Sequence, residues 1–207
     1  MTMHAIMRIG PVIPVVVIEH VSQAMPLADA LADGGINVIE ITLRSAAALD
    51  CIAAIASQHP EMTVGAGTVL TPAQMQAAKD AGATFAVSPG AHPNLIKASA
   101  ASGLPLLPGA ATASEMMALM AAGLTEMKFF PAVVAGGIDY LRAVASPLAD
   151  AVFCPTGGIS AETAADWLAL SNVACVGGTW VAPKDLLAAG DFATITAHAK
   201  ACQRLSG

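Results

Sequence analysis

Residues 33–44 read DGGINVIEITLR and contain a helix-to-strand connection followed by a strand. Gly34 and Gly35 form the stop that a helix C-terminus favours, and the run from Val38 alternates apolar and polar side chains as a β-strand does. Similar stops precede later apolar runs, at Gly82, Gly103 and Gly123. The stretch is therefore one unit of a repeating pattern.

Eight short apolar or β-branched runs recur along the chain, and Ala-rich segments with helical periodicity follow them. This alternation indicates parallel strands joined by helices. The predicted strands are Val12–Ile18, Val38–Leu43, Thr63–Val69, Phe85–Ser88, Pro105–Pro108, Glu126–Phe130, Ala151–Pro155 and Val173–Gly177. The pattern predicts an α/β fold of the (β/α)8 TIM barrel type, with a doubly wound sheet as the alternative.

Residues that favour helix starts follow several of these runs. The predicted starts are Thr71-Pro72, His92-Pro93, Thr112 to Glu115 and Ser160 to Thr163. Outside the repeats, Met1–Gly10 and the tail from Asp191 are predicted to be short helical extensions of the barrel.

Composition limits the class of protein. The chain has 207 residues, 56% of them hydrophobic, which is enough for one sizeable core and short of two typical domains. We therefore expect a single domain, residues 1–207. Fifteen acidic residues against nine basic ones give a net charge of −6 without a basic stripe, so no nucleic-acid partner is expected.

Neither a membrane span nor a secretory signal is visible. Gly, Pro or charge interrupts every apolar run before the roughly 18 residues that a membrane span needs. The first ten residues show no cleavable signal, so we expect a cytoplasmic protein without membrane association. Four cysteines lie far apart and without a C-x-x-C pair, which favours buried free thiols at Cys51, Cys154, Cys175 and Cys202.

Charged residues inside apolar strands are the candidates for chemistry, because barrel enzymes carry reactive groups at the carboxyl ends of their strands. Alternation along residues 38–44 puts Glu40, Thr42 and Arg44 on one face. Helices cover the outside of a barrel and require aliphatic residues there, so this polar face is predicted to point into the central cavity. The alternative is a buried Glu40–Arg44 ion pair that only fills space.

Lys128 is the one lysine of five that falls within a strand core, with Phe130 on the same face. Apolar surroundings disfavour the charged ammonium and favour a neutral amine, which can attack a carbonyl carbon. The pattern predicts a Schiff-base nucleophile. The alternatives are a lysine that pairs with Glu40 without catalytic work, or one that extends to the rim of the barrel.

Two glycine pairs follow the last two predicted strands, at Gly157-Gly158 and Gly177-Gly178. Glycines let backbone N–H groups approach a phosphate closely, and a helix starting near Ser160 would add a favourable dipole. We therefore predict a phosphate site at these turns, with two tight turns as the alternative.

The sequence offers no support for a metal or a nucleotide cofactor. Its five histidines lack metal-ligand spacing, and neither a dinucleotide fingerprint nor a Walker motif occurs. We expect an enzyme that needs no cofactor and no metal.

Six motifs together resemble the 2-keto-3-deoxy-6-phosphogluconate (KDPG) aldolase family, which includes 4-hydroxy-2-oxoglutarate (KHG) aldolases. The resemblance extends over nearly the whole chain. The motifs are IEITLR at 39–44, VGAGTVL at 64–70, SPG at 88–90, KFFP at 128–131, PTGGI at 155–159 and GGTW at 177–180.

The resemblance implies a class I aldolase that cleaves KDPG to pyruvate and glyceraldehyde 3-phosphate, a reaction of the Entner–Doudoroff type, and that also acts on 4-hydroxy-2-oxoglutarate. It implies a homotrimer whose partners are small 2-keto acids. The implied residue roles are Lys128 for the Schiff base, Glu40 for proton transfer, Arg44 and Thr68 for the carboxylate, Gly157, Gly158 and Thr179 for the phosphate, and Pro89 and Phe130 for further substrate contacts.

Alternatives on the same scaffold remain open at the level of sequence. One is a phosphosugar isomerase or epimerase, in which Glu40 abstracts a proton and Lys128 stabilises an enediolate. Another is a sensor of phosphorylated metabolites that needs no nucleophilic lysine. Related 6-phosphogalactonate aldolases carry an arginine at the end of the first strand, where this chain has Val17-Ile18-Glu19-His20, so the gluconate-type substrate is favoured.

Overall fold

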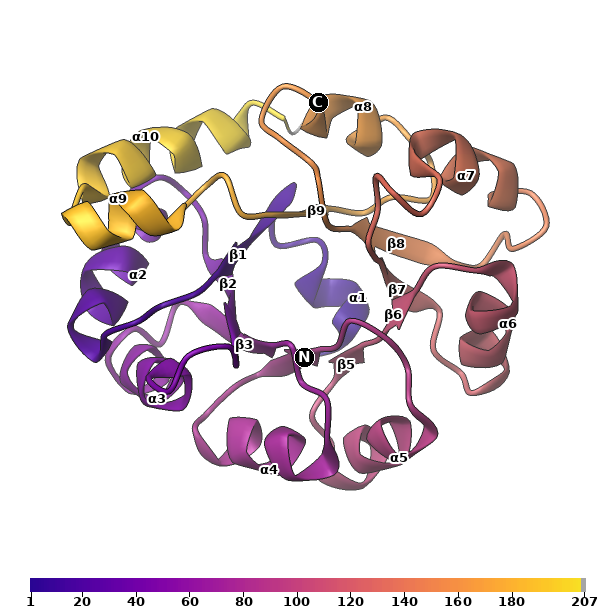
Figure 1. Ribbon diagram of the computed structural model, residues 1–207, viewed down its shortest axis with the longest axis horizontal. Coiled ribbons are helices and arrows are strands. Elements are labelled where there is room, and N and C mark those ends of the chain that lie inside the picture. The colour runs from indigo at the N-terminus through magenta and orange to yellow at the C-terminus, as the bar shows by residue number, and fades with distance from the viewer. Residues whose placement is uncertain (206–207) are drawn as a thin grey trace.

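The computed structural model describes residues 1–205, in which helices surround a curled parallel sheet (Figure 1). The strands are β1 Val12–Val16, β2 Val38–Thr42, β3 Thr63–Gly67, β4 Phe85–Val87, β5 Leu106–Leu107, β6 Gly109–Ala110, β7 Glu126–Phe129, β8 Val152–Pro155 and β9 Val176–Gly178. The helices are α1 Met3–Ile6, the 3₁₀ helix η1 Val21–Gln23, α2 Ala24–Asp33, α3 Ala48–Gln58, α4 Pro72–Asp80, α5 Pro93–Ser102, α6 Ala113–Ala121, α7 Gly137–Val144, α8 Ala164–Leu168, α9 Lys184–Ala189 and α10 Phe192–Gln203.

Strand pairing is parallel throughout the described residues and forms two sheets. The larger has the order β5-β4-β3-β2-β1-β9, and the smaller has the order β6-β7-β8. Two isolated parallel bridges, Phe153 with Val173 and Thr156 with Gly177, link the smaller sheet to the β9 segment. The α/β fold with strands joined by helices is as predicted.

Each predicted strand run overlaps an observed strand, with two differences. The run Pro105–Pro108 is followed by β6, and only Pro108 separates β5 from β6. A proline has no N–H to donate to a ladder, so it divides the extended segment into two pieces. The last strand begins at Val176 instead of Val173, which makes only a single bridge with Phe153.

Three of the four predicted helix starts are correct. Thr71 and Thr112 each accept a hydrogen bond from the backbone N–H three residues later, and His92 precedes a proline at the first helical position. The fourth, Ser160 to Thr163, is correct only at its end: Thr163 is the N-cap of α8, which begins at Ala164 after a turn that starts at Ser160. The two terminal extensions contain α1 and α10, as predicted.

The two ends of the curled sheet differ. Helix α1 lies in the middle of the ring in Figure 1, and its His4 contacts Glu126, the first residue of β7, at 3.1 Å between Nδ1 and Oε1. This end therefore carries the beginnings of the strands, whereas the candidate site faces the end where the carboxyl ends of the strands lie. Within residues 1–205, no helix has the length and apolar character that crossing a membrane requires.

Candidate active site

The polar face of β2 opens into a cavity of about 270 Å³ at the carboxyl ends of the strands. Glu40 and Thr42 are 3% and 1% exposed and line this cavity, as does Arg44, which stands exposed just beyond the strand. Ile39 and Ile41, the alternate residues, are fully buried in the hydrophobic core. The predicted division of β2 into an inner polar and an outer aliphatic face is confirmed.

Strand β7 brings Lys128 to the same cavity. Its side chain is almost fully buried, and Nζ lies 3.4 Å from Oε1 of Glu40 and 5.4 Å from the centroid of the Phe130 ring. On the opposite face of the strand, Phe129 stacks on Tyr140 of α7 with a centroid separation of 5.6 Å. The alternation thus separates the amine inside from aromatic packing outside.

Glu40 pairs with Lys128 and not with Arg44 in the described part of the chain. A carboxylate at this distance can accept a proton from the amine or return one to it. The guanidinium of Arg44 makes no ion pair within residues 1–205, although Nε donates a hydrogen bond to Oγ1 of Thr42 at 3.3 Å. The space-filling ion pair considered from sequence, Glu40 with Arg44, is therefore not the arrangement found.

The end of β3 supports Glu40 from the neighbouring strand. A Cβ atom at Gly67 would overlap the Glu40 carboxylate, so only glycine leaves the carboxylate its present position. The next residue, Thr68, lines the cavity with φ of 57°, a left-handed conformation that is unusual for a β-branched residue. Backbone strain of this kind is concentrated at functional sites.

The turns after β8 and β9 form the other side of the cavity. Gly157 and Gly158 have φ of 105° and 80°, which L side chains rarely adopt, and both line the cavity together with Thr179. The helix expected to start near Ser160 begins later: residues 160–163 form a turn, and α8 is a five-residue helix that begins at Ala164. Any phosphate contact at this place would therefore come from the turns themselves.

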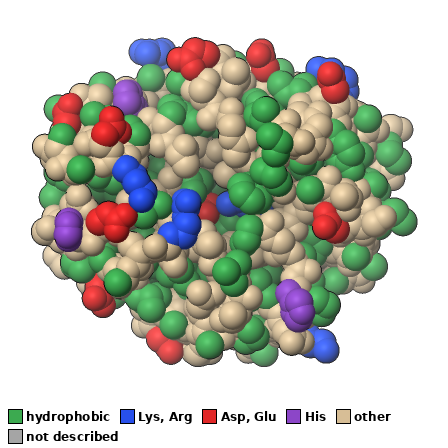
Figure 2. Space-filling model, viewed as in Figure 1, with side chains coloured by type: hydrophobic (Ala, Val, Ile, Leu, Met, Phe, Trp, Pro, Cys, Tyr) green, Lys and Arg blue, Asp and Glu red, His purple; other side chains and the backbone are tan. Residues whose placement is uncertain are grey.

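Nine residues proposed from sequence line this one cavity: Glu40, Arg44, Thr68, Pro89, Lys128, Phe130, Gly157, Gly158 and Thr179. Sequence reasoning gave no role to three other lining residues, Val15, Thr156 and Ile159, whereas Gly177 belongs to the second predicted phosphate turn and Thr42 to the predicted polar face. Thr156 follows β8 and its hydroxyl is buried; its position directly after a predicted strand was the signal that could have identified it. Figure 2 shows the hollow near the centre of this face, with basic and acidic side chains at and within it.

The four cysteines are free and buried, as predicted, and none lines the cavity. A hydrogen bond with Cys154, together with burial, raises the pKa of the Cys175 thiol well above its ordinary range. Burial and the nearby Asp50 raise the pKa of Cys51 to about 11. Both thiols are therefore protonated at neutral pH and unsuited to nucleophilic attack.

The sequence matches the family described as KDPG and KHG aldolase over residues 3–198. The chain belongs to the KDPG and KHG aldolase family. It is 49% identical over 196 residues to the KHG/KDPG aldolase of Escherichia coli K12, a match that covers 95% of this chain and 92% of the relative.

Solved structures of KDPG aldolases have the same fold. One, from Legionella pneumophila, holds pyruvate captured at low pH as a covalent carbinolamine intermediate; it is 42% identical, with a TM-score of 0.94 over 96% of this chain and 97% of that one. Another, from Zymomonas mobilis ZM4 with 3-phosphoglycerate, is 43% identical, with a TM-score of 0.92 over 98% of this chain and 95% of that one.

Proposed function

We propose that this chain is a class I aldolase that cleaves KDPG to pyruvate and glyceraldehyde 3-phosphate and also accepts 4-hydroxy-2-oxoglutarate. The observation that carries the proposal is the buried amine of Lys128, 3.4 Å from the Glu40 carboxylate, in a cavity that Arg44 also lines. A carbinolamine is the adduct of an amine and a carbonyl carbon, so the covalent pyruvate in the Legionella relative supports the same chemistry here.

The first half of the reaction forms a Schiff base. Glu40 accepts a proton from Lys128, the neutral amine attacks the C2 carbonyl of the substrate, and Glu40 moves protons between nitrogen and the C2 oxygen until water leaves. The product is an iminium ion on Lys128. Throughout, Arg44 and Thr68 hold the C1 carboxylate, which the guanidinium can contact with two parallel charge-assisted hydrogen bonds.

The second half breaks the C3–C4 bond. The C4 hydroxyl gives its proton to the Glu40 carboxylate, the C3–C4 electron pair moves towards the iminium nitrogen, and glyceraldehyde 3-phosphate leaves with C4 as its aldehyde carbon. Glu40 returns the proton to C3 of the remaining enamine, and water hydrolyses the iminium to release pyruvate and the free lysine. The step needs no metal and no cofactor, because the iminium itself accepts the electron pair.

The turns at Gly157-Gly158 and Thr179 are proposed to bind the distal phosphate through backbone N–H groups and the threonine hydroxyl. Phosphoglycerate in the Zymomonas relative supports a phosphate-bearing ligand for this cavity. From β1 the cavity receives the aliphatic side chain of Val15. The end of the first predicted strand, Val17-Ile18-Glu19-His20, has no arginine, which favours the gluconate-type substrate over the galactonate-type one, for which the resemblance implies an arginine there.

Three properties of the whole chain are part of the proposal. The two sheets would form one closed (β/α)8 barrel and a single domain, which the bridges from Phe153 to Val173 and from Thr156 to Gly177 of β9, and the shared segment around Pro108, support. The protein would be a homotrimer in the cytoplasm. Large exposed apolar side chains, such as Met117 and Val134, are consistent with contacts between copies.

The test is turnover of purified protein on KDPG, followed as pyruvate through lactate dehydrogenase and NADH. We expect release of one pyruvate per KDPG, and loss of activity in Lys128→Met but not in Lys97→Met, whose lysine lies on exposed α5. An isomerase or epimerase would convert a phosphosugar without releasing pyruvate, and a sensor would bind without turnover; either result would refute the aldolase.

A further inference from the structure

Thr42 is a cavity residue to which the proposed chemistry gives no role. It stands on β2 between Glu40 and Arg44, with its side chain on the same face and almost fully buried. Its hydroxyl is hydrogen-bonded to the guanidinium of Arg44.

The Thr42 hydroxyl makes two hydrogen bonds with different roles. It donates its single proton to the backbone carbonyl of Val16, at the end of β1, with a separation of 3.0 Å. Because that proton is engaged, the oxygen presents its lone pairs elsewhere and accepts from Nε of Arg44 at 3.3 Å. The hydroxyl therefore connects the guanidinium to a rigid neighbouring strand.

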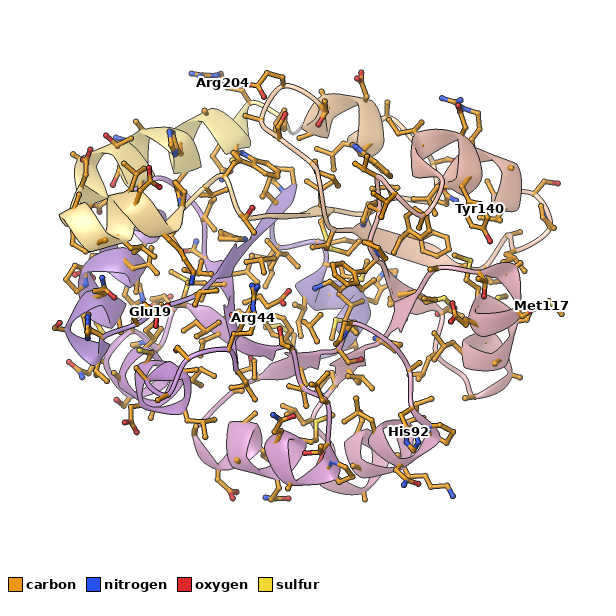
Figure 3. The ribbon with its side chains drawn as sticks, in the orientation of Figure 1. Glu19, Arg44, His92, Met117, Tyr140 and Arg204 are labelled. Carbon is orange, nitrogen blue, oxygen red and sulfur yellow. The ribbon has the colours of Figure 1, made fainter. Side chains whose placement is uncertain are left out.

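Arg44 needs such a support. It lies beyond the end of β2, its side chain is exposed, and Figure 3 shows it near the centre of the open face. A free arginine side chain has up to about 2 kcal/mol of rotamer entropy to lose on binding a ligand. With Nε fixed by Thr42, the two terminal Nη groups remain for a bidentate carboxylate contact.

We infer that Thr42 is a positioning residue for substrate binding: its hydroxyl orients Arg44 so that the guanidinium receives the substrate carboxylate. The inference rests on the proposed function, in which Arg44 holds that carboxylate. Since the carboxylate is held equally in the ground state and the transition state, loss of the hydroxyl weakens binding without slowing the chemical steps.

Ser45 provides a matched control. Its hydroxyl also donates to a β1-side carbonyl, that of Ile18, so it links the same two segments of chain. It makes no hydrogen bond with Arg44 among the contacts of residues 1–205. A merely structural role for such hydroxyls would give the same result at both positions.

The experiment measures KM and kcat for KDPG, and the pyruvate concentration that half-saturates borohydride trapping, in the wild type, Thr42→Val, Thr42→Ser and Ser45→Ala. Thr42→Val keeps the volume but removes the hydroxyl. We expect it to raise KM and the half-saturating pyruvate concentration about 10-fold, with kcat within about 2-fold of the wild type. Thr42→Ser restores both values, and Ser45→Ala changes neither.

Hydroxyacetone, a ketone without a carboxylate, distinguishes loss of the Arg44 orientation from damage to the Lys128 nucleophile. Its trapping is expected to be equal in the wild type and Thr42→Val. An unchanged KM in Thr42→Val overturns the inference and leaves the proposed function standing. So does weakened trapping of hydroxyacetone by Thr42→Val together with an equal rise of KM in Ser45→Ala. Absence of trapping in the wild type overturns both. If thermal melts show that Thr42→Val does not fold, Thr42→Ala replaces it in the same comparison.

Discussion

The proposed chemistry depends on two side chains of opposite charge, Lys128 and Glu40, held 3.4 Å apart and almost excluded from water. A buried ion pair rarely stabilises a protein more than apolar residues of similar volume do. Two neighbouring strands nevertheless place this pair on the wall of an open cavity, with Arg44 at its mouth. The arrangement is better explained by reaction chemistry than by stability.

Glu40→Gln separates those two explanations, because it keeps the shape of the side chain but removes its ability to accept and return a proton. We expect kcat for KDPG to fall about 10² to 10⁴-fold with little change in KM. Single-turnover kinetics and thermal melts on the same preparation provide the measurement. A large fall in melting temperature with nearly normal turnover would instead identify Glu40 as a structural counter-ion.

Arg44→Ala tests the carboxylate contact. The guanidinium is exposed at the cavity mouth and makes no ion pair within residues 1–205, so its loss is expected to leave the fold intact. Removing a charge-assisted contact of this kind costs about 1.5 to 3 kcal/mol, which corresponds to a rise in KM of about 10 to 150-fold. Steady-state kinetics and circular dichroism check both statements. A variant that unfolds would show that Arg44 is part of the core structure.

Among the elements, β3 leaves room for the Glu40 carboxylate through Gly67. Gly67→Ala introduces a Cβ that overlaps the Glu40 carboxylate, whereas a Cβ at Gly10 would have no neighbour within 4 Å. We expect Gly67→Ala to lower kcat at least about 10-fold by displacing the carboxylate, and Gly10→Ala to leave it unchanged. Kinetics on the two variants make the comparison. Equal activities would show that the carboxylate position is not critical.

At the start of helix α6, a capping glutamate makes the stability of the fold depend on pH, independently of the active site. Hydrogen bonds from the backbone N–H groups of Ala111 and Thr112 hold the pKa of Glu115 below its ordinary value of 4.5. A carboxyl group whose pKa is lower in the folded state stabilises the fold at pH values above its unfolded-state pKa. That stabilisation is lost as the pH falls through the lower, folded-state pKa.

Glu115→Gln is therefore expected to weaken the pH dependence below about 4.5. Because Glu115 is exposed, the effect is small, about 1 to 3 °C in melting temperature between pH 5 and pH 3. The matched helix start on α4 uses the neutral pair Thr71 and Gln74, so Gln74→Ala should lower the melting temperature equally at every pH. Identical pH profiles for the wild type and Glu115→Gln would contradict this account.

At the level of the whole molecule, the periodicity of the sequence was sufficient to predict the strands that carry the site residues. Alternation in residues 38–44 predicted the inner face of β2, and the lone strand lysine predicted Lys128. The Glu40–Lys128 contact was raised from sequence only as an alternative, because alternation does not show how strands 88 residues apart are brought across the cavity. The start of α8 was placed too early because Ser160 and Thr163 favour a turn as readily as a helix cap. Thr156 was missed because a single hydroxyl after a strand does not by itself distinguish a site residue from a turn residue.

The central claim is that Lys128 forms a Schiff base with a 2-keto acid, and trapping tests it most directly. The native protein is incubated with pyruvate and borohydride, digested with trypsin and mapped by mass spectrometry, with Lys128→Met as the control. The account predicts the mass of one reduced pyruvate imine on Lys128, loss of tryptic cleavage after that residue, and no label in the variant. Label on another lysine, or no label in the wild type, would contradict it.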